Sequence, residues 1–418
     1  MQEKIIADHI LEKMNLENVF KILNDNLLAM LTEEEVEYSM QLQDFCLDLD
    51  PKIDRSKAVY ELFPELGKHG YMQRINKWND FTPYGMRKDI LLGLQLSCLD
   101  CQLEMGRVSS GILCANPTFH YFHQGGESSE IQKVQDDLMS GKKVGSIGIT
   151  EPENGSDSVN MKTQCTKVDD GIIYNGEKVF TTNGAKADYF VVYGVYDTSN
   201  PRGSMVQSLI KREWGVETRR LKINSVPRIH IAHTILNNVK VPKEFILADD
   251  GLGYKRLFEG LVPERLGLIG SALGVSWAGL IYAIIYTNLR HQFGEPILNH
   301  QGVGFSLADL LSRLTAATSL ALSAANIYDE KILFAEKRNA AAEKWVAGVS
   351  SQAKYICARL SHEVLYEVQQ QMGGISVTDN TFIDDLCDGS KIEEVIGGAR
   401  NIQLLIIQNG LRRYKSML

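Results

Sequence analysis

The chain has no excess of basic residues: 52 Asp and Glu against 44 Lys and Arg leave a formal net charge of -8 over 418 residues. Nucleic-acid-binding domains usually carry a strong basic excess, so this balance argues against that class of protein. It does not exclude an anionic ligand, because a few local cations and backbone N–H groups are enough to bind one. With 44% hydrophobic and 23% charged residues, the composition is ordinary for a soluble globular protein with a large core.

Long uninterrupted hydrophobic runs and a signal peptide are also missing. The most apolar stretch, residues 261–285, contains Glu264, Arg265 and several glycines, which favours a buried helix over a membrane span. The N-terminus has no apolar core of signal-peptide length, so we expect a cytoplasmic protein. Seven scattered cysteines, an odd number, suit a reducing compartment. Cys98 and Cys101 form an isolated C-x-x-C within a helical pattern, so we interpret them as core residues and expect no metal site.

Secondary-structure signals change twice along the chain. Residues 1–30 carry a short amphipathic pattern that predicts an N-terminal helical extension. Thr32 followed by Glu35 is a capping-box pattern, and it opens the α-helical domain that we expect over residues 31–143.

From residue 144 to 249, short β-branched and aromatic runs separated by turn residues predict an antiparallel β domain. The Asn175-Gly176 pair between two of these runs is a strong signal for a tight hairpin. Helical periodicity returns over residues 250–418. The predicted fold class is therefore α+β, with a helical domain, a β domain and a C-terminal four-helix bundle whose helices are expected at residues 252–291, 303–332, 338–373 and 389–412.

One loop of the predicted β domain combines a tight bend with hydroxyl groups. It reads Thr150-Glu151-Pro152-Glu153-Asn154-Gly155-Ser156-Asp157 and follows a predicted strand. Gly155 permits the bend, while Thr150 and Ser156 can donate hydrogen bonds. A phosphate or the polar edge of a heterocycle would fit this loop. Taken alone, the loop is explained equally well as an Asn-Gly turn that binds nothing.

Four segments in register resemble the acyl-CoA dehydrogenase family. Besides the loop 150–157 they are residues 178–184, residues 290–294 with Gln301 shortly after, and residues 370–374. The resemblance spans most of the chain, from about residue 30 to 415. It implies FAD as cofactor, α,β-dehydrogenation of an acyl-CoA thioester, and an electron-transferring flavoprotein as partner. It also implies a homotetramer or homodimer, because a neighbouring subunit contributes the last segment to the FAD site.

Carried over residue by residue, the resemblance implies a cofactor site in two parts. The flavin would be lined by residues of the β domain, namely Ile147, Ile149, Thr150, Ser156, Phe180 and Thr182. The rest of FAD would be held by Arg290, Phe293, Gln301, Gln370, Gly373 and Gly374. Ala399 and Asn401 stand where the family usually has polar flavin contacts, so the cofactor would be held slightly differently. The acyl thioester would meet Ser156, Arg265, Gly397 and Gly398, although Arg265 is explained equally well as the partner in a structural ion pair.

The catalytic base departs from the commonest family pattern. Many members place a Glu before the last helix, in a Tyr-Glu-Gly-Thr segment, and that position is Gly397 here. A minority, including the isovaleryl-CoA and long-chain types, place it immediately before an Arg on another helix, as in Glu264-Arg265. Glu264 would then remove the proton α to the thioester, while the N–H of Gly397 polarises the thioester oxygen. The plainer interpretation is that Glu264 lies in a first helical turn after Pro263, where a carboxylate is favourable without any function.

Other functions stay open. The substrate could be an acyl or aminoacyl group tethered to a carrier protein, the enzyme could be a desulfinase or lyase relative, or the chain could bind partners without flavin. Residues 72–84 lack the glycine-rich loop usual in the family, so the acyl pocket is expected to be atypical. The pattern also favours Glu393 and Glu394 as a solvated helix start, and Gly270 and Gly274 as points of close helix packing.

Overall fold

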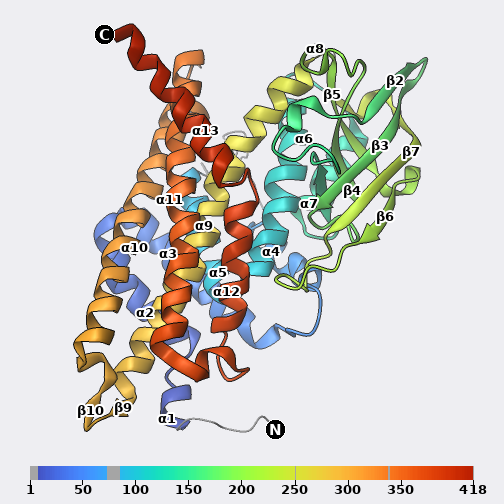
Figure 1. Ribbon diagram of the computed structural model, residues 1–418. Helices are drawn as coiled ribbons and strands as arrows, with labels where there is room; N and C mark the ends of the chain where they lie inside the picture. Colours follow the sequence, from blue (N-terminus) through green and yellow to red (C-terminus); the bar gives the residue numbers. More distant parts are fainter. Residues whose placement is uncertain (1–7, 73–84, 250, 338, 418) are drawn as a thin grey trace. The chain divides into compact units, whose positions relative to one another are not determined.

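The structure is a computed structural model that describes residues 8–72, 85–249, 251–337 and 339–417 (Figure 1). The chain forms two compact units: one takes residues 1–53, 85–104 and 265–418, the other residues 54–84 and 105–264. Helices α5 (Met86–Val108) and α9 (Leu252–Leu289) run from one unit into the other. The four-segment division drawn from the sequence stays a prediction. The atypical loop expected over residues 72–84 lies, after residue 72, outside the described residues.

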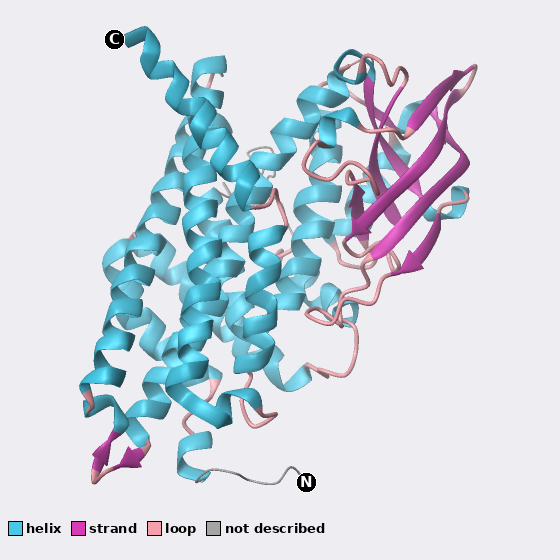
Figure 2. Ribbon diagram, viewed as in Figure 1, coloured by secondary structure: helices cyan, strands magenta, loops and turns pink. Residues whose placement is uncertain are grey.

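The first unit is helical apart from one small hairpin (Figure 2). Besides parts of α5 and α9, its helices are α1 (Asp8–Leu11), α2 (Leu16–Leu27), α3 (Glu33–Leu49), α10 (Gln301–Tyr328), α11 (Ala340–Met372), α12 (Ile383–Val395) and α13 (Arg400–Leu411). The hairpin joins β9 (His291–Gln292) to β10 (Glu295–Pro296). The predicted capping box is confirmed, because Thr32 and Glu35 cap α3 reciprocally.

Glycines bring α5 and α9 into backbone contact within this unit. A Cβ built on Gly274 would lie 2.2 Å from the carbonyl oxygen of Leu94, and one built on Gly270 would lie 2.7 Å from that of Ile90. Side chains at these positions would therefore collide with backbone that cannot move independently. The close helix packing predicted for both glycines is confirmed.

The helix predicted over residues 389–412 is wrong, because two helices replace it. The backbone of Gly397 has φ 64° and that of Gly398 has φ 90°, which is the left-handed region that glycine enters without strain. The amide Nε2 of Gln403 donates to the carbonyl oxygens of both, at 3.1 and 2.6 Å. The pair thus ends α12 and turns the chain into α13.

The second unit is built on an eight-stranded sheet, in the order β6-β7-β3-β2-β4-β5-β8 with β1 paired to β4. The strands are β1 (Gly145–Gly148), β2 (Gln164–Val168), β3 (Gly171–Thr181), β4 (Tyr189–Val195), β5 (Met205–Lys211), β6 (Glu217–Arg220), β7 (Ala232–Pro242) and β8 (Ile246–Ala248). Helices of the same unit are α4 (Phe63–Lys68), α6 (Asn116–His123), α7 (Ser129–Met139) and α8 (Pro201–Ser204). The sheet is mixed rather than purely antiparallel, since β1 runs parallel to β4.

The tight hairpin predicted at Asn175-Gly176 is also wrong. Both residues lie inside β3, which pairs with β7 along its length. The ladder shifts register between Tyr174 and Gly176, so the glycine marks a bulge rather than a chain reversal. A Cβ on Gly176 would meet Thr163 at 2.6 Å, which explains a glycine in mid-strand.

Helix α9 is long and apolar enough to cross a membrane by composition, but 94% of its most apolar window is buried inside the protein. This is typical of a core helix. Cys98 and Cys101 are confirmed as buried core residues on α5. Within the described ranges, no three His, Cys, Asp or Glu side chains gather as metal ligands.

Candidate functional site

The ends of β1 and β3 are tied together in the β-sheet unit. Ser146 Oγ donates to the carbonyl oxygen of Thr182 at 2.5 Å, and the N–H of Val179 donates to that of Thr150 at 2.8 Å. The loop after β1 closes on itself, since the backbones of Glu151 and Asn154 exchange two hydrogen bonds. These bonds draw together the segments that carry the six residues predicted to line a flavin, which we call the flavin-side edge. They are Ile147, Ile149, Thr150, Ser156, Phe180 and Thr182.

Phe180 has the geometry of a residue held for a ligand. The β3–β7 ladder shifts register again between Lys178 and Thr181, and Phe180 in this bulge has φ 55°. Its side chain is 62% exposed. A bulky residue in the left-handed region costs about 1–3 kcal/mol and persists where the surroundings enforce it, often at functional sites. The bulge leaves the Phe180 ring exposed, one residue beyond Val179, whose N–H donates to the carbonyl oxygen of Thr150.

A second aromatic residue with the same backbone conformation lies in the helical unit. Phe293 and Gly294 form the two-residue turn between β9 and β10, with φ 55° and 89°. Asn or Asp normally takes the first position of such a turn. The Phe293 ring is 95% exposed and meets the His300 ring edge to face, at a centroid distance of 5.8 Å. An exposed phenyl ring in a strained turn again points to a binding role.

The structure gathers the FAD residues predicted in the helical unit at one end of the bundle (Figure 1). Arg290 directly precedes the β9–β10 hairpin, Phe293 lies in its turn, and Gln301 begins α10. Gln370, Gly373 and Gly374 stand at the end of α11. A hydrogen bond of 2.7 Å from Ser306 Oγ to Glu367 Oε1 joins the first turns of α10 to the last turns of α11.

The remaining predicted contacts of the helical unit lie elsewhere in it. Gly397, Gly398 and Ala399 form the joint between α12 and α13, and Asn401 is in the first turn of α13. In Figure 1 this joint is well removed from the β9–β10 hairpin. Ala399 and Asn401 are thus not grouped with Arg290 in a single chain.

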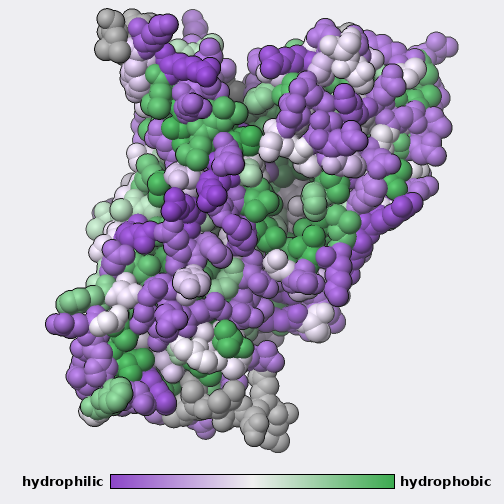
Figure 3. All heavy atoms as spheres, viewed as in Figure 1, coloured by the Kyte–Doolittle hydropathy of each residue, from purple (hydrophilic) through white to green (hydrophobic). Residues whose placement is uncertain are grey.

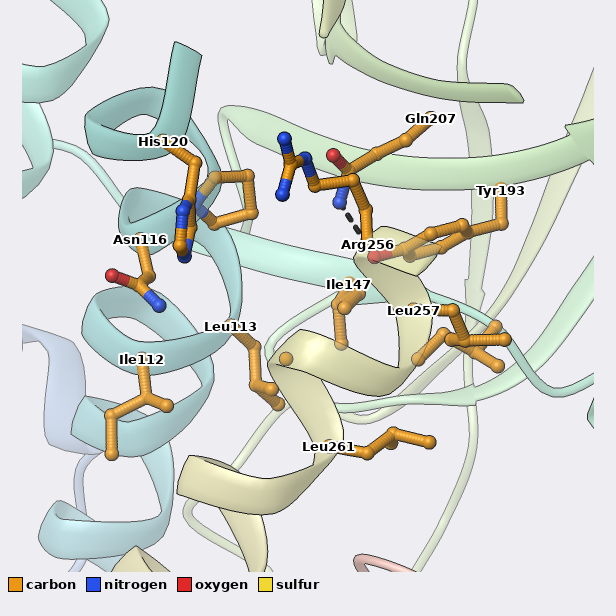
Figure 4. Close-up of a pocket in the computed structure, with 13 residues that line it drawn as sticks. Ile112, Leu113, Asn116, His120, Ile147, Tyr193, Gln207, Arg256, Leu257 and Leu261 are labelled. Carbon is orange, nitrogen blue, oxygen red and sulfur yellow. Dashed lines mark hydrogen bonds between the residues drawn. The ribbon is translucent and has the colours of Figure 1, made fainter. Parts of the chain in front are cut away.

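A cavity opens in the β-sheet unit next to the predicted flavin residues (Figure 4). It is narrow, with a cavity volume of about 20 Å³. Apolar side chains, among them Ile112, Leu113, Ile147, Leu257 and Leu261, form much of its wall. Its polar members are Asn116 and His120 from α6, Arg256 from α9, and Tyr193 and Gln207 from the sheet, the last two joined by a hydrogen bond of 2.5 Å.

Glu264 follows this cavity wall along α9, three residues after Leu261. The helix begins at Leu252, so Pro263 lies inside it and Glu264 is not in a first turn. The interpretation of Glu264 as a carboxylate that stabilises a helix N-terminus is therefore wrong. Proline inside a helix removes a hydrogen bond and costs about 3 kcal/mol, and such a cost is tolerated where a function requires it. Arg265, the next residue, is buried.

Buried polar groups surround Glu393 in the helical unit. Ser271 Oγ donates to Glu393 Oε1 at 2.6 Å and accepts from Ser97 Oγ at 3.1 Å, while Lys354 Nζ donates to the Glu393 backbone carbonyl. Burial raises the pKa of the Glu393 carboxyl to about 7, and Glu104 adds to the rise while Lys354 and Ser271 oppose it. Glu393 and Glu394 are buried in the last turn of α12, so the prediction of a solvated helix start is wrong.

Glu393→Gln is expected to change how stability depends on pH. Because the folded pKa of about 7 lies above the ordinary 4.5, the carboxyl favours folding below about pH 4.5 and loses this contribution as pH rises through 7. The amide does not titrate, so the variant should gain about 3 kcal/mol in unfolding free energy relative to the wild type between pH 4.5 and 8. Urea unfolding across this range measures it. As a control, Asp388→Asn neutralises an exposed acid of the same helix and should leave the dependence of unfolding free energy on pH as in the wild type. If Glu393→Gln also showed the same dependence on pH as the wild type, the account would be contradicted.

Sequence reasoning assigned no role to three residues that organise the flavin-side edge. Asn183, at φ 65°, donates to the carbonyl oxygens of Gly106 and Gly145 at 2.9 and 3.1 Å. Glu151 and Lys178 form a buried ion pair of 2.8 Å. The sequence carried no clear signal for this pair, because β3 also contains the polar residues Asn175 and Glu177.

Two family models match the chain. The description "Acyl-CoA dehydrogenase, C-terminal domain" applies to residues 251–412, and "Acyl-CoA dehydrogenase, middle domain" to residues 146–239. Together they cover more than half of the chain.

Named relatives and solved structures agree with these models. The chain is 28% identical over 330 residues to the short-chain specific acyl-CoA dehydrogenase of Megasphaera elsdenii, covering 78% of this chain and 81% of the relative. It is 28% identical over 289 residues to the caffeyl-CoA reductase–Etf complex subunit CarC of Acetobacterium woodii, covering 68% and 73%. The structure of butyryl-CoA dehydrogenase from Megasphaera elsdenii superposes with a TM-score of 0.81 at 26% identity, covering 91% of this chain and 98% of that one.

Proposed function

Since the chain belongs to the acyl-CoA dehydrogenase family and is an FAD-dependent oxidoreductase, we propose that it desaturates an acyl-CoA thioester between its α and β carbons, with Glu264 as the base. The observation that carries this proposal is the position of Glu264. It stands inside α9, directly after a helix-interior proline and one turn beyond the cavity wall, while the position of the common family base is Gly397.

The residues of the flavin-side edge fit the cofactor. A flavin presents a flat apolar face and a polar edge, and this part of the sheet offers the exposed ring of Phe180 together with a loop that carries the hydroxyls of Thr150 and Ser156. The loop is open at its bend, because a Cβ on Gly155 would meet only Thr150 Cγ2, at 3.9 Å. Bound FAD supplies the acceptor for the hydride that leaves the β carbon.

The chain's own residues have two tasks in this reaction. The Glu264 carboxylate takes the proton from the α carbon, so that the electron pair of the α C–H bond forms the new double bond. The backbone N–H of Gly397 donates to the thioester oxygen and makes the α proton more acidic. The products are an α,β-unsaturated thioester and a protonated Glu264.

The cavity in the β-sheet unit supports a thioester substrate. Its apolar wall suits methylene groups, and its polar rim suits the amides and charges of a pantetheine-bearing carrier. Arg256, paired with Glu259 on the same helix, supplies a cation at this rim. Ile147 and Ile149, predicted to line the flavin, also line this cavity, so we propose that the thioester would enter it next to the cofactor.

The identity of the carrier can be tested directly. FAD-loaded protein should convert an acyl-CoA to a product that has lost two hydrogens, and should do so with a higher kcat/KM than the matched acyl group on a carrier-protein phosphopantetheine. Mass spectrometry of the thioesters after single-turnover mixing measures both. A higher kcat/KM for the carrier-bound acyl group would move the function to biosynthetic desaturation, and release of sulfite or another leaving group would indicate a lyase.

The proposal extends to partners. The relative from Acetobacterium woodii carries Etf in its name, which supports an electron-transferring flavoprotein as acceptor. We also propose a homotetramer or homodimer in a reducing cytoplasm, which sedimentation of the FAD-loaded protein and cell fractionation would test. Apolar side chains gathered over α13 support an assembly (Figure 3). Among the exposed apolar residues of the helical unit are Leu404, Leu405 and Leu411 on α13, and Phe293, Phe305, Tyr366 and Val377 elsewhere.

A further inference from the structure

The pair Glu151–Lys178 lies at the centre of the flavin-side edge yet takes no part in the chemistry above. Glu151 belongs to the loop after β1, one residue beyond Thr150. Lys178 belongs to β3, two residues before Phe180. The Lys178 side chain is fully buried and that of Glu151 is 5% exposed, with Nζ and Oε1 2.8 Å apart. Ions this deeply buried lose several kcal/mol of hydration each, so the pair needs an explanation.

Both carboxylate oxygens of Glu151 accept hydrogen bonds besides the contact with Lys178. Glu151 Oε1 accepts from the N–H and Oγ1 of Thr163 at 2.9 and 2.6 Å, and Oε2 accepts from the N–H of Lys162. Lys178 Nζ also approaches the carbonyl oxygen of Ile149 at 3.3 Å. Burial alone would raise the pKa of the Glu151 carboxyl, but the Lys178 ammonium and these hydrogen bonds outweigh it and hold that pKa below its ordinary value.

The pair joins three chain segments that are separate in the sequence. It connects the start of the loop at residues 149–151, the entry to β2 at residues 162–163, and the bulged end of β3. The loop carries Thr150 and Ser156, and the end of β3 carries Phe180. Residues that contact a ligand keep their geometry only when their supports are fixed, and a buried, hydrogen-bonded ion pair is a directional support that apolar packing would not provide.

We propose that Glu151 and Lys178 are positioning residues for FAD, whose ion pair clamps the hydroxyl-bearing loop to the strand end that presents Phe180. The inference rests on the binding of FAD at this edge, but not on the identity of the substrate or of the base. It explains why an acid stands at the second position of the loop and why a lysine occupies a buried position of β3.

The test uses Glu151→Gln, Lys178→Met and the double variant Glu151→Gln/Lys178→Met. Each single change leaves one charge buried without its partner, so the FAD dissociation constant should rise by about 10- to 100-fold. The visible absorbance band of bound FAD should also shift, because the groups around its polar edge are displaced. Flavin fluorescence titration of the deflavinated protein and the spectrum of the loaded protein measure these effects without any turnover.

The double variant separates positioning from plain stability. Removal of both charges should restore the thermal unfolding midpoint of the FAD-free protein toward the wild-type value, because no unpaired charge remains buried. FAD affinity should nevertheless stay reduced, since the clamp is absent. If affinity instead recovers together with the unfolding midpoint, or if Glu151→Gln folds and binds FAD as the wild type does, the proposal is overturned. Where Lys178→Met fails to fold, Glu151→Gln and the double variant decide the question.

Arg87→Met is the matched control. It breaks a half-buried ion pair of 2.5 Å between Arg87 and Glu35, which lies in the helical unit. Its unfolding midpoint should fall while its FAD affinity stays within about twofold of the wild type. Failure of the substrate proposal would leave all these binding results unchanged, so the two proposals can fail independently.

Discussion

Glu264→Gln is expected to slow reduction of the bound flavin by an acyl-CoA substrate by about 10²–10⁴-fold, the usual contribution of a positioned general base. The amide keeps the size of the carboxylate but cannot accept the α proton. FAD affinity and substrate affinity should change little, because the residue acts in the transition state. Anaerobic stopped-flow mixing at saturating substrate gives the rate constant, and equilibrium binding of a substrate analogue gives the affinity.

Glu394→Gln is the matched control for the base. Glu394 lies three residues before Gly397 and pairs with Lys391 and, at 3.5 Å, with Arg400. Glu394 is, with the buried Glu393, one of two acids close in sequence to the segment that carries the common family base, so this variant tests whether a carboxylate there has taken over the role. Flavin reduction should remain at the wild-type rate. A slow Glu394→Gln together with a normal Glu264→Gln would assign the base to α12 and contradict our account.

Gly274→Ala is expected to lower the free energy of unfolding by about 3 kcal/mol, at the upper end of what overpacking costs. The new methyl group would lie 2.2 Å from the carbonyl oxygen of Leu94 and 2.7 Å from Cβ of Ser97. Neither atom can withdraw without moving α5 away from α9. Because α9 carries Glu264 in the same helix, part of the lost packing should also appear as slower flavin reduction. Chemical denaturation of the FAD-loaded protein measures the loss in stability.

Gly348→Ala is the matched control for Gly274→Ala, and it is expected to raise the free energy of unfolding rather than lower it. Gly348 lies inside α11, and a Cβ there would meet no atom within 4 Å. Alanine is the better helix former by about 1 kcal/mol, so this variant should be more stable than the wild type. An equal loss of stability in both variants would show that close packing at Gly274 is not the cause.

The sequence predicted those features that depend on local patterns. The capping box at Thr32 and the strand runs leading to Thr150 follow from nearest neighbours along the chain, and the structure has both. The hairpin at Asn175-Gly176 failed for the opposite reason, because pairing of β3 with the distant β7 overrides the local turn preference. The prediction of a single helix over residues 389–412 was wrong because Gly397 and Gly398 adopt the left-handed backbone conformation and interrupt the helix. The periodicity of apolar residues alone does not reveal this interruption.

The site was predictable only in part. Resemblance supplied the residues around the flavin, but the exposed ring of Phe180 depends on a bulge that no pattern announces. The ion pair of Glu151 and Lys178 joins positions 27 residues apart, and the burial of Glu393 requires helices from four parts of the chain. Such contacts are properties of the packed chain. The correction of greatest consequence concerns Glu264, whose place inside α9 removes the helix-terminus explanation that the sequence left open.

The most direct test of the central claim is anaerobic titration of the FAD-loaded protein with a panel of acyl-CoA thioesters that vary in chain length and branching. We expect at least one of them to bleach the visible absorbance of the oxidised flavin and to be recovered as its α,β-unsaturated thioester, in an amount equal to the flavin reduced. If dithionite bleaches the flavin but no acyl-CoA does, the chain is not an acyl-CoA dehydrogenase in function, whatever its fold.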